Sequence, residues 1–155
     1  MIYNVNIAFQ EEYKKLDALC KDMFGGADGL SEYIRQIEAL TGSERMLCED
    51  TETVYARLKK LRWIRNRLVH EVGTWDEPMC GEADIQWLKN FYGRILAIND
   101  PLAVIYKAKR EREAGRRLRA AGGNSVSAGR VADGGKRTSL WSRFVGKLKN
   151  IFAKK

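Results

Sequence analysis

The sequence is poor in proline, which interrupts helices, and in histidine and cysteine, which bind transition metals. It has two prolines, one histidine and three cysteines among its 155 residues. The cysteines (Cys20, Cys48 and Cys80) are odd in number and form no Cys-x-x-Cys pair, which argues against a disulfide framework and a zinc site. We therefore expect reduced thiols in a cytoplasmic protein, with Cys20 as a small residue of the core.

Long apolar runs and an even distribution of charge are also lacking. Without such runs we expect neither a secretory signal nor a transmembrane span. Residues 1–100 contain 13 Lys and Arg against 17 Asp and Glu, a net charge of −4. Residues 101–155 contain 15 against 3, a net charge of +12, which accounts for the overall +8. The basic character therefore belongs to the C-terminal third, and the mildly acidic charge of the N-terminal body does not favour a general affinity for nucleic acid there.

Apolar residues at helical spacing are abundant and predict an all-α protein. We expect an up-and-down helical bundle of four to five helices over residues 1–119. The first predicted helix covers about 7–24, and the second begins at Ser31 as N-cap and ends before Gly42. The third covers about 51–72, and the fourth contains residues 85–96. The fifth is opened by Asp100-Pro101 and runs to Arg119.

The C-terminal region differs in composition from the bundle. Residues 120–138, rich in Gly, Ala and Ser, predict a flexible basic linker, and residues 139–155 predict a basic amphipathic helix. Its apolar face comprises Leu140, Trp141, Phe144, Val145, Leu148, Ile151 and Phe152. This face suits an anionic membrane surface, which would make the protein peripheral to the membrane, or a hydrophobic groove on a partner protein. Docking of the helix onto its own bundle is the third option.

The only histidine lies in the segment Arg-Asn-Arg-Leu-Val-His at residues 65–70, within the third predicted helix. Histidine exchanges protons near neutral pH, and an arginine can bind a phosphate beside it. On a helical wheel Arg65 falls on the otherwise apolar stripe that we predict to extend to Val72, where a buried guanidinium needs a partner. Arg65 and His70 point about 140° apart on that wheel, so a second protomer could complete a shared site.

This Arg-Asn-x-x-x-His pattern resembles the active-site motif of HEPN domains. These are small helical bundles, many of them metal-independent ribonucleases of toxin–antitoxin and phage-defence systems. The resemblance covers roughly residues 5–115 and implies a homodimer, an RNA substrate, a possible antitoxin partner, and no metal or other cofactor. It implies that His70 is the general acid–base, that Arg65 stabilises charge on the phosphate, and that Asn66 orients the substrate or His70.

Three other interpretations stay open. The protein could be a non-catalytic interaction or adaptor module tethered by its C-terminal amphipathic helix. Arg65 could form a structural ion pair with Glu38 or Asp84, leaving His70 as an ordinary surface histidine. The charged segment from Lys107 to Arg119 could attract phosphates generically, without sequence recognition or chemistry.

Overall fold

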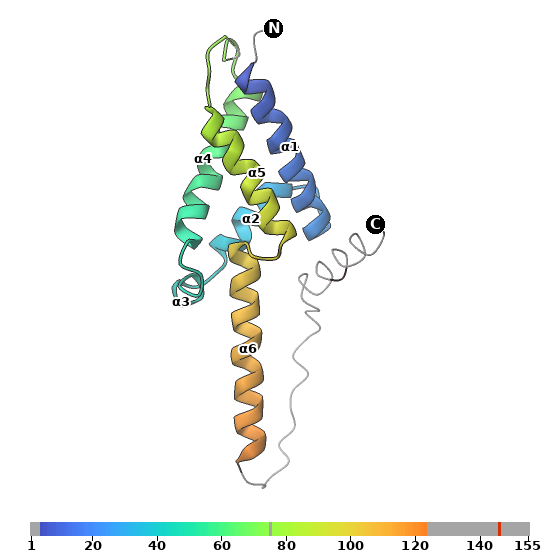
Figure 1. Cartoon of the computed structure of the whole chain (residues 1–155), viewed down its shortest axis with the longest axis vertical. Coiled ribbons are helices and arrows are strands. Elements are labelled where there is room, and N and C mark those ends of the chain that lie inside the picture. Colours follow the sequence, from blue (N-terminus) through green and yellow to red (C-terminus); the bar gives the residue numbers. More distant parts are fainter. Residues whose placement is uncertain (1–3, 75, 124–145, 147–155) are drawn as a thin grey trace.

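The computed structural model describes residues 4–74, 76–123 and 146, and it confirms the predicted all-α bundle. Within the described residues every regular element is a helix (Figure 1). The helices are α1 (Val5–Phe24), α2 (Gly29–Glu38), α3 (Gly42–Arg45), α4 (Thr51–His70), α5 (Glu82–Leu96) and α6 (Pro101–Gly122). The short helix α3 was not predicted. It is held by a capping box in which the Thr41 hydroxyl and the Glu44 carboxylate bind each other's backbone N–H groups.

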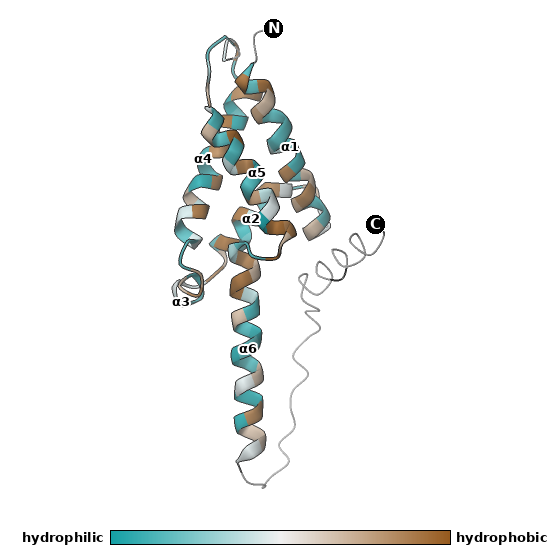
Figure 2. Cartoon of the chain, viewed as in Figure 1, coloured by the Kyte–Doolittle hydropathy of each residue, from teal (hydrophilic) through white to brown (hydrophobic). Residues whose placement is uncertain are grey.

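Helices α1, α2, α4 and α5 enclose the hydrophobic core. The stripe predicted along α1 is buried at five positions, and Cys20 is among them, as expected. Burial of each large side chain contributes roughly 1.5–3 kcal/mol, so this shared core stabilises the arrangement of the helices. The start of α6 joins the core through Leu102, Ala103 and Ile105. Beyond that start α6 is mostly hydrophilic (Figure 2).

The predicted N-cap of α2, Ser31, lies three residues after the observed N-cap Asp28, because a tertiary contact sets the start of this helix. The Asp17 carboxylate of α1 accepts the backbone N–H of Leu30 at 2.9 Å and so satisfies a donor of the first turn. Gly29, with φ of 47°, brings the backbone so near Asp17 that a Cβ there would lie 2.2 Å from Asp17 Oδ1. The helix therefore begins at Gly29, with Asp28 preceding it.

The predicted end of the third helix at Val72 is also wrong. Helix α4 ends at His70, and Val72 is fully exposed beyond it instead of belonging to the buried stripe. The chain then crosses to α5 in a loop held by the buried Asn6 of α1. The Asn6 side chain donates to the Glu77 carbonyl at 2.8 Å and accepts from the Met79 N–H at 3.0 Å. This amide therefore fixes the end of the bundle at which α4 stops.

Helix α6 begins as predicted and ends later than predicted. The Asp100 carboxylate caps it by accepting the Ala103 N–H, with Pro101 in the first turn. The completely buried Tyr33 hydroxyl of α2 donates to Asp100 Oδ2 at 2.5 Å. The helix continues through Gly122, so the linker boundary predicted at residue 120 is wrong by three residues. Its second half projects from the end of the bundle opposite the N-terminus (Figure 1).

Candidate functional site

Helix α4 carries positive charge without compensating acids along most of its length. From residue 53 to residue 70 it contains no Asp or Glu. Its cations, which define the basic segment of α4, are Arg57, Lys59, Lys60, Arg62, Arg65 and Arg67. Such a cluster of cations is unexpected because the first 100 residues are net acidic, and the net charge of that region conceals it. A single helix thus concentrates positive charge within an otherwise acidic body.

Carboxylates from neighbouring elements neutralise only part of this segment. Asp84 of α5 lies 2.8 Å from Arg57 Nη2 and 3.8 Å from Lys60 Nζ. Arg67 is paired with Glu71 at 2.6 Å. Among the described residues no acid pairs with Lys59, Arg62 or Arg65, so three cations remain available to an anionic ligand.

Arg65 occupies a half-buried position among core residues, as its place on the helical wheel predicts. Leu61, Ile64 and Leu68 around it are all at most 1% exposed. Its Nη1 donates to Asn66 Oδ1 at 3.2 Å. The structural ion pairs considered for Arg65 do not form, because Asp84 is paired with Arg57 and Glu38 accepts the hydroxyl of Tyr55 instead. The guanidinium is therefore oriented by an amide and is not neutralised.

Tyr13 of α1 lies within electrostatic reach of Arg65. Burial raises the pKa of this phenol well above its ordinary value, and the Asp17 carboxylate raises it further. The positive charges of Arg65 and Arg62 act in the opposite direction on the same pKa. Two guanidinium groups thus influence one largely buried hydroxyl between α1 and α4. Tyr13 was predicted only as a core residue, because its proximity to α4 depends on tertiary packing.

His70 is the last residue of α4 and is exposed. Within residues 4–74 and 76–123 no side chain or backbone group is hydrogen-bonded to its imidazole, so both ring nitrogens are accessible. Asn66, one turn earlier, is also exposed. Arg65 and His70 diverge by about 140° on an ideal helix, and one protomer therefore does not direct both side chains at one point.

Aromatic and aliphatic side chains are exposed beside the motif. Trp63 is 54% exposed, and the Arg67 guanidinium lies 4.9 Å from its ring centroid. Val69 is 48% exposed on the same helix. In contrast, Trp87 packs at the core by stacking on Phe91 with 4.9 Å between ring centroids. The two tryptophans therefore differ, and only Trp63 offers a ring face to a ligand or partner.

Several predicted features fall outside this site. Residues Leu140, Trp141, Phe144, Val145, Leu148, Ile151 and Phe152 of the predicted amphipathic helix, and the linker from residue 124, lie outside the described residues. The described part of the chain contains no group of three or more His, Cys, Asp and Glu side chains placed to hold a metal ion. No described helix is long and apolar enough to span a bilayer.

Comparison with known proteins gives the chain a family without a biochemical role. Neither a curated protein nor a solved structure matches it. The sequence model of a family of unknown function, DUF6548, matches residues 7–139. This match covers most of the chain, and the protein therefore belongs to the DUF6548 family.

Proposed function

We propose that this protein is a HEPN-like, metal-independent endoribonuclease in which Arg65 and His70 act on an RNA phosphodiester. One observation carries the proposal. The half-buried Arg65 has no carboxylate partner among the described residues, on a helical segment that holds six cations and no acid and ends in the only histidine. Such a segment attracts a polyanion, and its histidine supplies proton transfer beside the bound phosphate.

The basic segment of α4 supports substrate binding before any chemistry. A guanidinium donates two parallel hydrogen bonds to phosphate oxygens, and Arg65 has no competing acid within the described residues. Lys59 and Arg62 add positive charge on the same helix. The exposed ring of Trp63 offers a stacking surface for a base, a contact worth about 1–3 kcal/mol in single-strand recognition.

The chemistry follows from the two motif side chains. His70 as general base removes the proton from an RNA 2′-hydroxyl, and that oxygen attacks the adjacent phosphorus. The bond from phosphorus to the 5′-oxygen breaks, and this oxygen leaves with a proton from a general acid. The products are a 2′,3′-cyclic phosphate and a 5′-hydroxyl. Arg65 stabilises the charge that develops on the phosphoryl oxygens, while Asn66 orients Arg65 through the 3.2 Å hydrogen bond.

The divergence of Arg65 and His70 favours a site shared by two protomers. In a symmetric dimer with its two-fold axis near α4, Arg65 of one protomer faces His70 of the other. Each of the two composite sites then holds one Arg65 and one His70, and the leaving 5′-oxygen takes its proton from a water molecule. The exposed Val69 provides apolar surface that such an interface would bury.

Cleavage of RNA by the purified full chain in EDTA tests the proposal. We expect His70→Ala and Arg65→Ala each to lower the rate by about 100-fold or more, since general acid–base catalysis contributes about 10²–10⁴-fold and one charge-stabilising donor about 10²–10³-fold. Both positions lack ion pairs within the described part of the chain, so the variants should keep their helical circular dichroism. Lys89→Ala, which removes an exposed cation of α5, is the matched control and should cleave like the wild type. Equal cleavage by His70→Ala would refute the assignment.

Mixing the two inactive variants tests the shared site. If each site takes Arg65 from one protomer and His70 from the other, half the sites in a mixed dimer are intact. An equimolar mixture of Arg65→Ala and His70→Ala should then recover about a quarter of the wild-type activity. A mixture that stays inactive, although the subunits exchange, would place both residues of a site in one chain.

The alternative is the non-catalytic interaction module, held at a membrane or partner by residues 139–155. A folded dimer that cleaves no RNA would favour it. An antitoxin partner and a role in phage defence belong to the ribonuclease proposal and depend on its cleavage result.

A further inference from the structure

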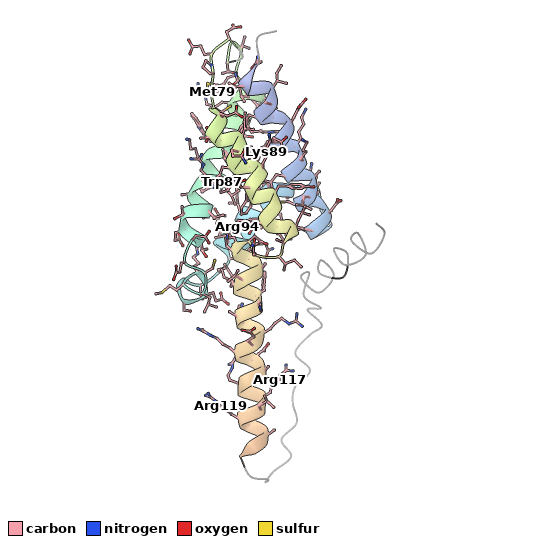
Figure 3. All side chains as sticks on the ribbon, viewed as in Figure 1. Met79, Trp87, Lys89, Arg94, Arg117 and Arg119 are labelled. Carbon is pink, nitrogen blue, oxygen red and sulfur yellow. The ribbon has the colours of Figure 1, made fainter. Side chains whose placement is uncertain are left out.

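The projecting half of α6, residues 107–122, is a second cationic surface remote from the motif. This α6 extension has seven Lys and Arg against two Glu, a net charge of +5. Its cations are Lys107, Lys109, Arg110, Arg112, Arg116, Arg117 and Arg119. All are exposed except the half-buried Lys109. Arg117 and Arg119 point to opposite sides of the helix (Figure 3), so positive charge surrounds the extension.

Contacts at the base of the α6 extension fix its direction relative to the bundle. The buried Tyr33–Asp100 hydrogen bond anchors the first turn of the helix. One turn later the Tyr106 hydroxyl donates to Gln36 Oε1 at 3.3 Å. Lys109 forms an ion pair with Glu44 of α3, and this bond lowers the pKa of the Glu44 carboxyl. Such anchoring makes the extension a preorganised surface rather than a frayed terminus.

Beyond Lys109 five arginines of the α6 extension outnumber two glutamates, and no ion pair forms among the described residues of this stretch. Arg112, Arg116 and Arg119 follow one another at spacings of four and three residues and share one face of the helix. Within the described residues none of the three forms an ion pair. Like charges at these spacings repel each other and destabilise a helix. A ligand with regularly spaced negative charges would relieve this repulsion.

The composition of the α6 extension favours nucleic acid over a bilayer or another helix. An interfacial helix needs a continuous apolar face, whereas the only large aliphatic side chain among residues 107–122 is Leu118, which is 74% exposed. A coiled coil needs apolar residues at alternating spacings of three and four, which these residues also lack. Seven cations on one rigid helix instead complement a phosphate backbone.

We propose that the α6 extension binds the sugar–phosphate backbone of RNA, with Arg112, Arg116 and Arg119 donating to successive phosphates. The choice of RNA rests on the proposed function, while the electrostatic argument does not. The C-terminal end of α4 lies at the same end of the bundle as the start of α1, and α6 leaves the opposite end (Figure 1). An RNA that contacts both surfaces therefore lies along the length of α4, and the extension selects substrates long enough to reach it.

The salt dependence of RNA binding tests this inference. The probe is a mixed-sequence RNA duplex with a single-stranded overhang, titrated with the full chain carrying His70→Ala so that no cleavage occurs. In that background R116Q/R119Q removes two outer cations, and K15Q/K89Q removes two exposed cations of α1 and α5 as the control.

The slope of log affinity against log salt concentration is negative, and we expect its magnitude to be smaller by about 1.4–1.8 for R116Q/R119Q than for the control. Between about 50 and 200 mM salt its affinity should then fall about ten-fold less than that of the control. Equal slopes for the two variants would overturn the inference. So would unchanged RNA binding together with weaker binding of R116Q/R119Q to phosphatidylserine vesicles.

Failure of this inference is distinguishable from failure of the proposed function. If the protein cleaves RNA but the two variants show equal slopes, the nuclease proposal stands and the role of the α6 extension is refuted. If the protein cleaves no RNA but R116Q/R119Q shows the expected change in slope, the nuclease proposal is refuted and the α6 extension stands as an RNA-binding surface.

Discussion

Replacement of Tyr33 by phenylalanine removes one hydroxyl from the center of the contact between α2 and α6. That hydroxyl donates to Asp100 Oδ2 at 2.5 Å and accepts from the Leu102 N–H at 3.4 Å. The ring itself stays in place, because its edge-on contact with Phe91 at 5.4 Å does not involve the hydroxyl. Tyr33→Phe therefore changes hydrogen bonding in the core without creating a large cavity.

The expected cost follows from what remains around Asp100. This carboxyl is completely buried, its Oδ1 has no hydrogen-bond partner in the described part of the chain, and Oδ2 would keep only the 3.4 Å bond from the Ala103 N–H. Hydrogen bonds to charged groups contribute about 1.5–3 kcal/mol, and a buried acceptor left unpaired loses at least that much. We expect Tyr33→Phe to lower the free energy of unfolding by roughly 2–3 kcal/mol.

Urea denaturation followed by circular dichroism measures this difference. The control is Tyr55→Phe, which removes a similar hydroxyl–carboxylate bond, to Glu38 at 2.8 Å, from an exposed position. Water replaces that bond, so we expect a loss below about 1 kcal/mol. If Tyr33→Phe costs no more than Tyr55→Phe, the buried hydrogen bond does not stabilise the contact and this reasoning fails.

The pH dependence of stability provides a second test of the same contact. Burial raises the pKa of Asp100 above its ordinary value, while the Tyr33 hydrogen bond lowers it in part. Between the unfolded and folded pKa values the native state binds more protons than the unfolded state. The contribution of Asp100 to the free energy of unfolding therefore decreases as pH rises through this window. Asp100→Asn should abolish this component, and an unchanged pH profile would contradict it.

Three further outcomes are expected. Asn6→Ala should cost about 1–3 kcal/mol and speed hydrogen exchange in residues 74–80, because buried backbone groups lose their partners. The hydrogen bond from Arg94 lowers the pKa of Asp50. The stabilisation by this ion pair is therefore present above the ordinary pKa of an aspartate and is lost as the pH falls through the pKa of Asp50 in the folded protein. Arg94→Leu should flatten this dependence of the free energy of unfolding on acid pH, measured by urea titration. Burial raises the pKa of the Cys20 thiol, and peptide mapping after iodoacetamide should find it the last of the three cysteines to be alkylated.

Local signals in the sequence predicted the fold well where local interactions decide the structure. Asp100 and Pro101 start α6 as expected, because the cap and the fixed φ of proline act within one turn. Ser31 failed as the start of α2 because Asp17, a residue of another helix, satisfies the backbone there. The prediction that the third helix ends at Val72 failed because helical periodicity does not specify where the last turn ends.

The sequence pattern proposed the residues of the candidate site, whereas their surroundings are seen only in the structure. The wheel placed Arg65 among core residues, and the structure finds it half-buried there. That Asp84 pairs with Arg57 and leaves Arg65 without an acid depends on how α5 packs against α4, which no sequence pattern specified. The exposure of Trp63 and the effect of the Arg65 charge on the pKa of Tyr13 likewise depend on how the helices pack.

The length of the α6 extension has a consequence for whatever is attached to it. Sixteen helical residues from Lys107 to Gly122 span about 24 Å, so the chain departs from the helix at that distance from its base. Fluorophores at position 7, in the first turn of α1, and at position 122 would therefore report on opposite ends of the described part of the molecule. A label at position 7 would lie at the end of the bundle that carries His70, whereas one at position 122 would lie away from the motif.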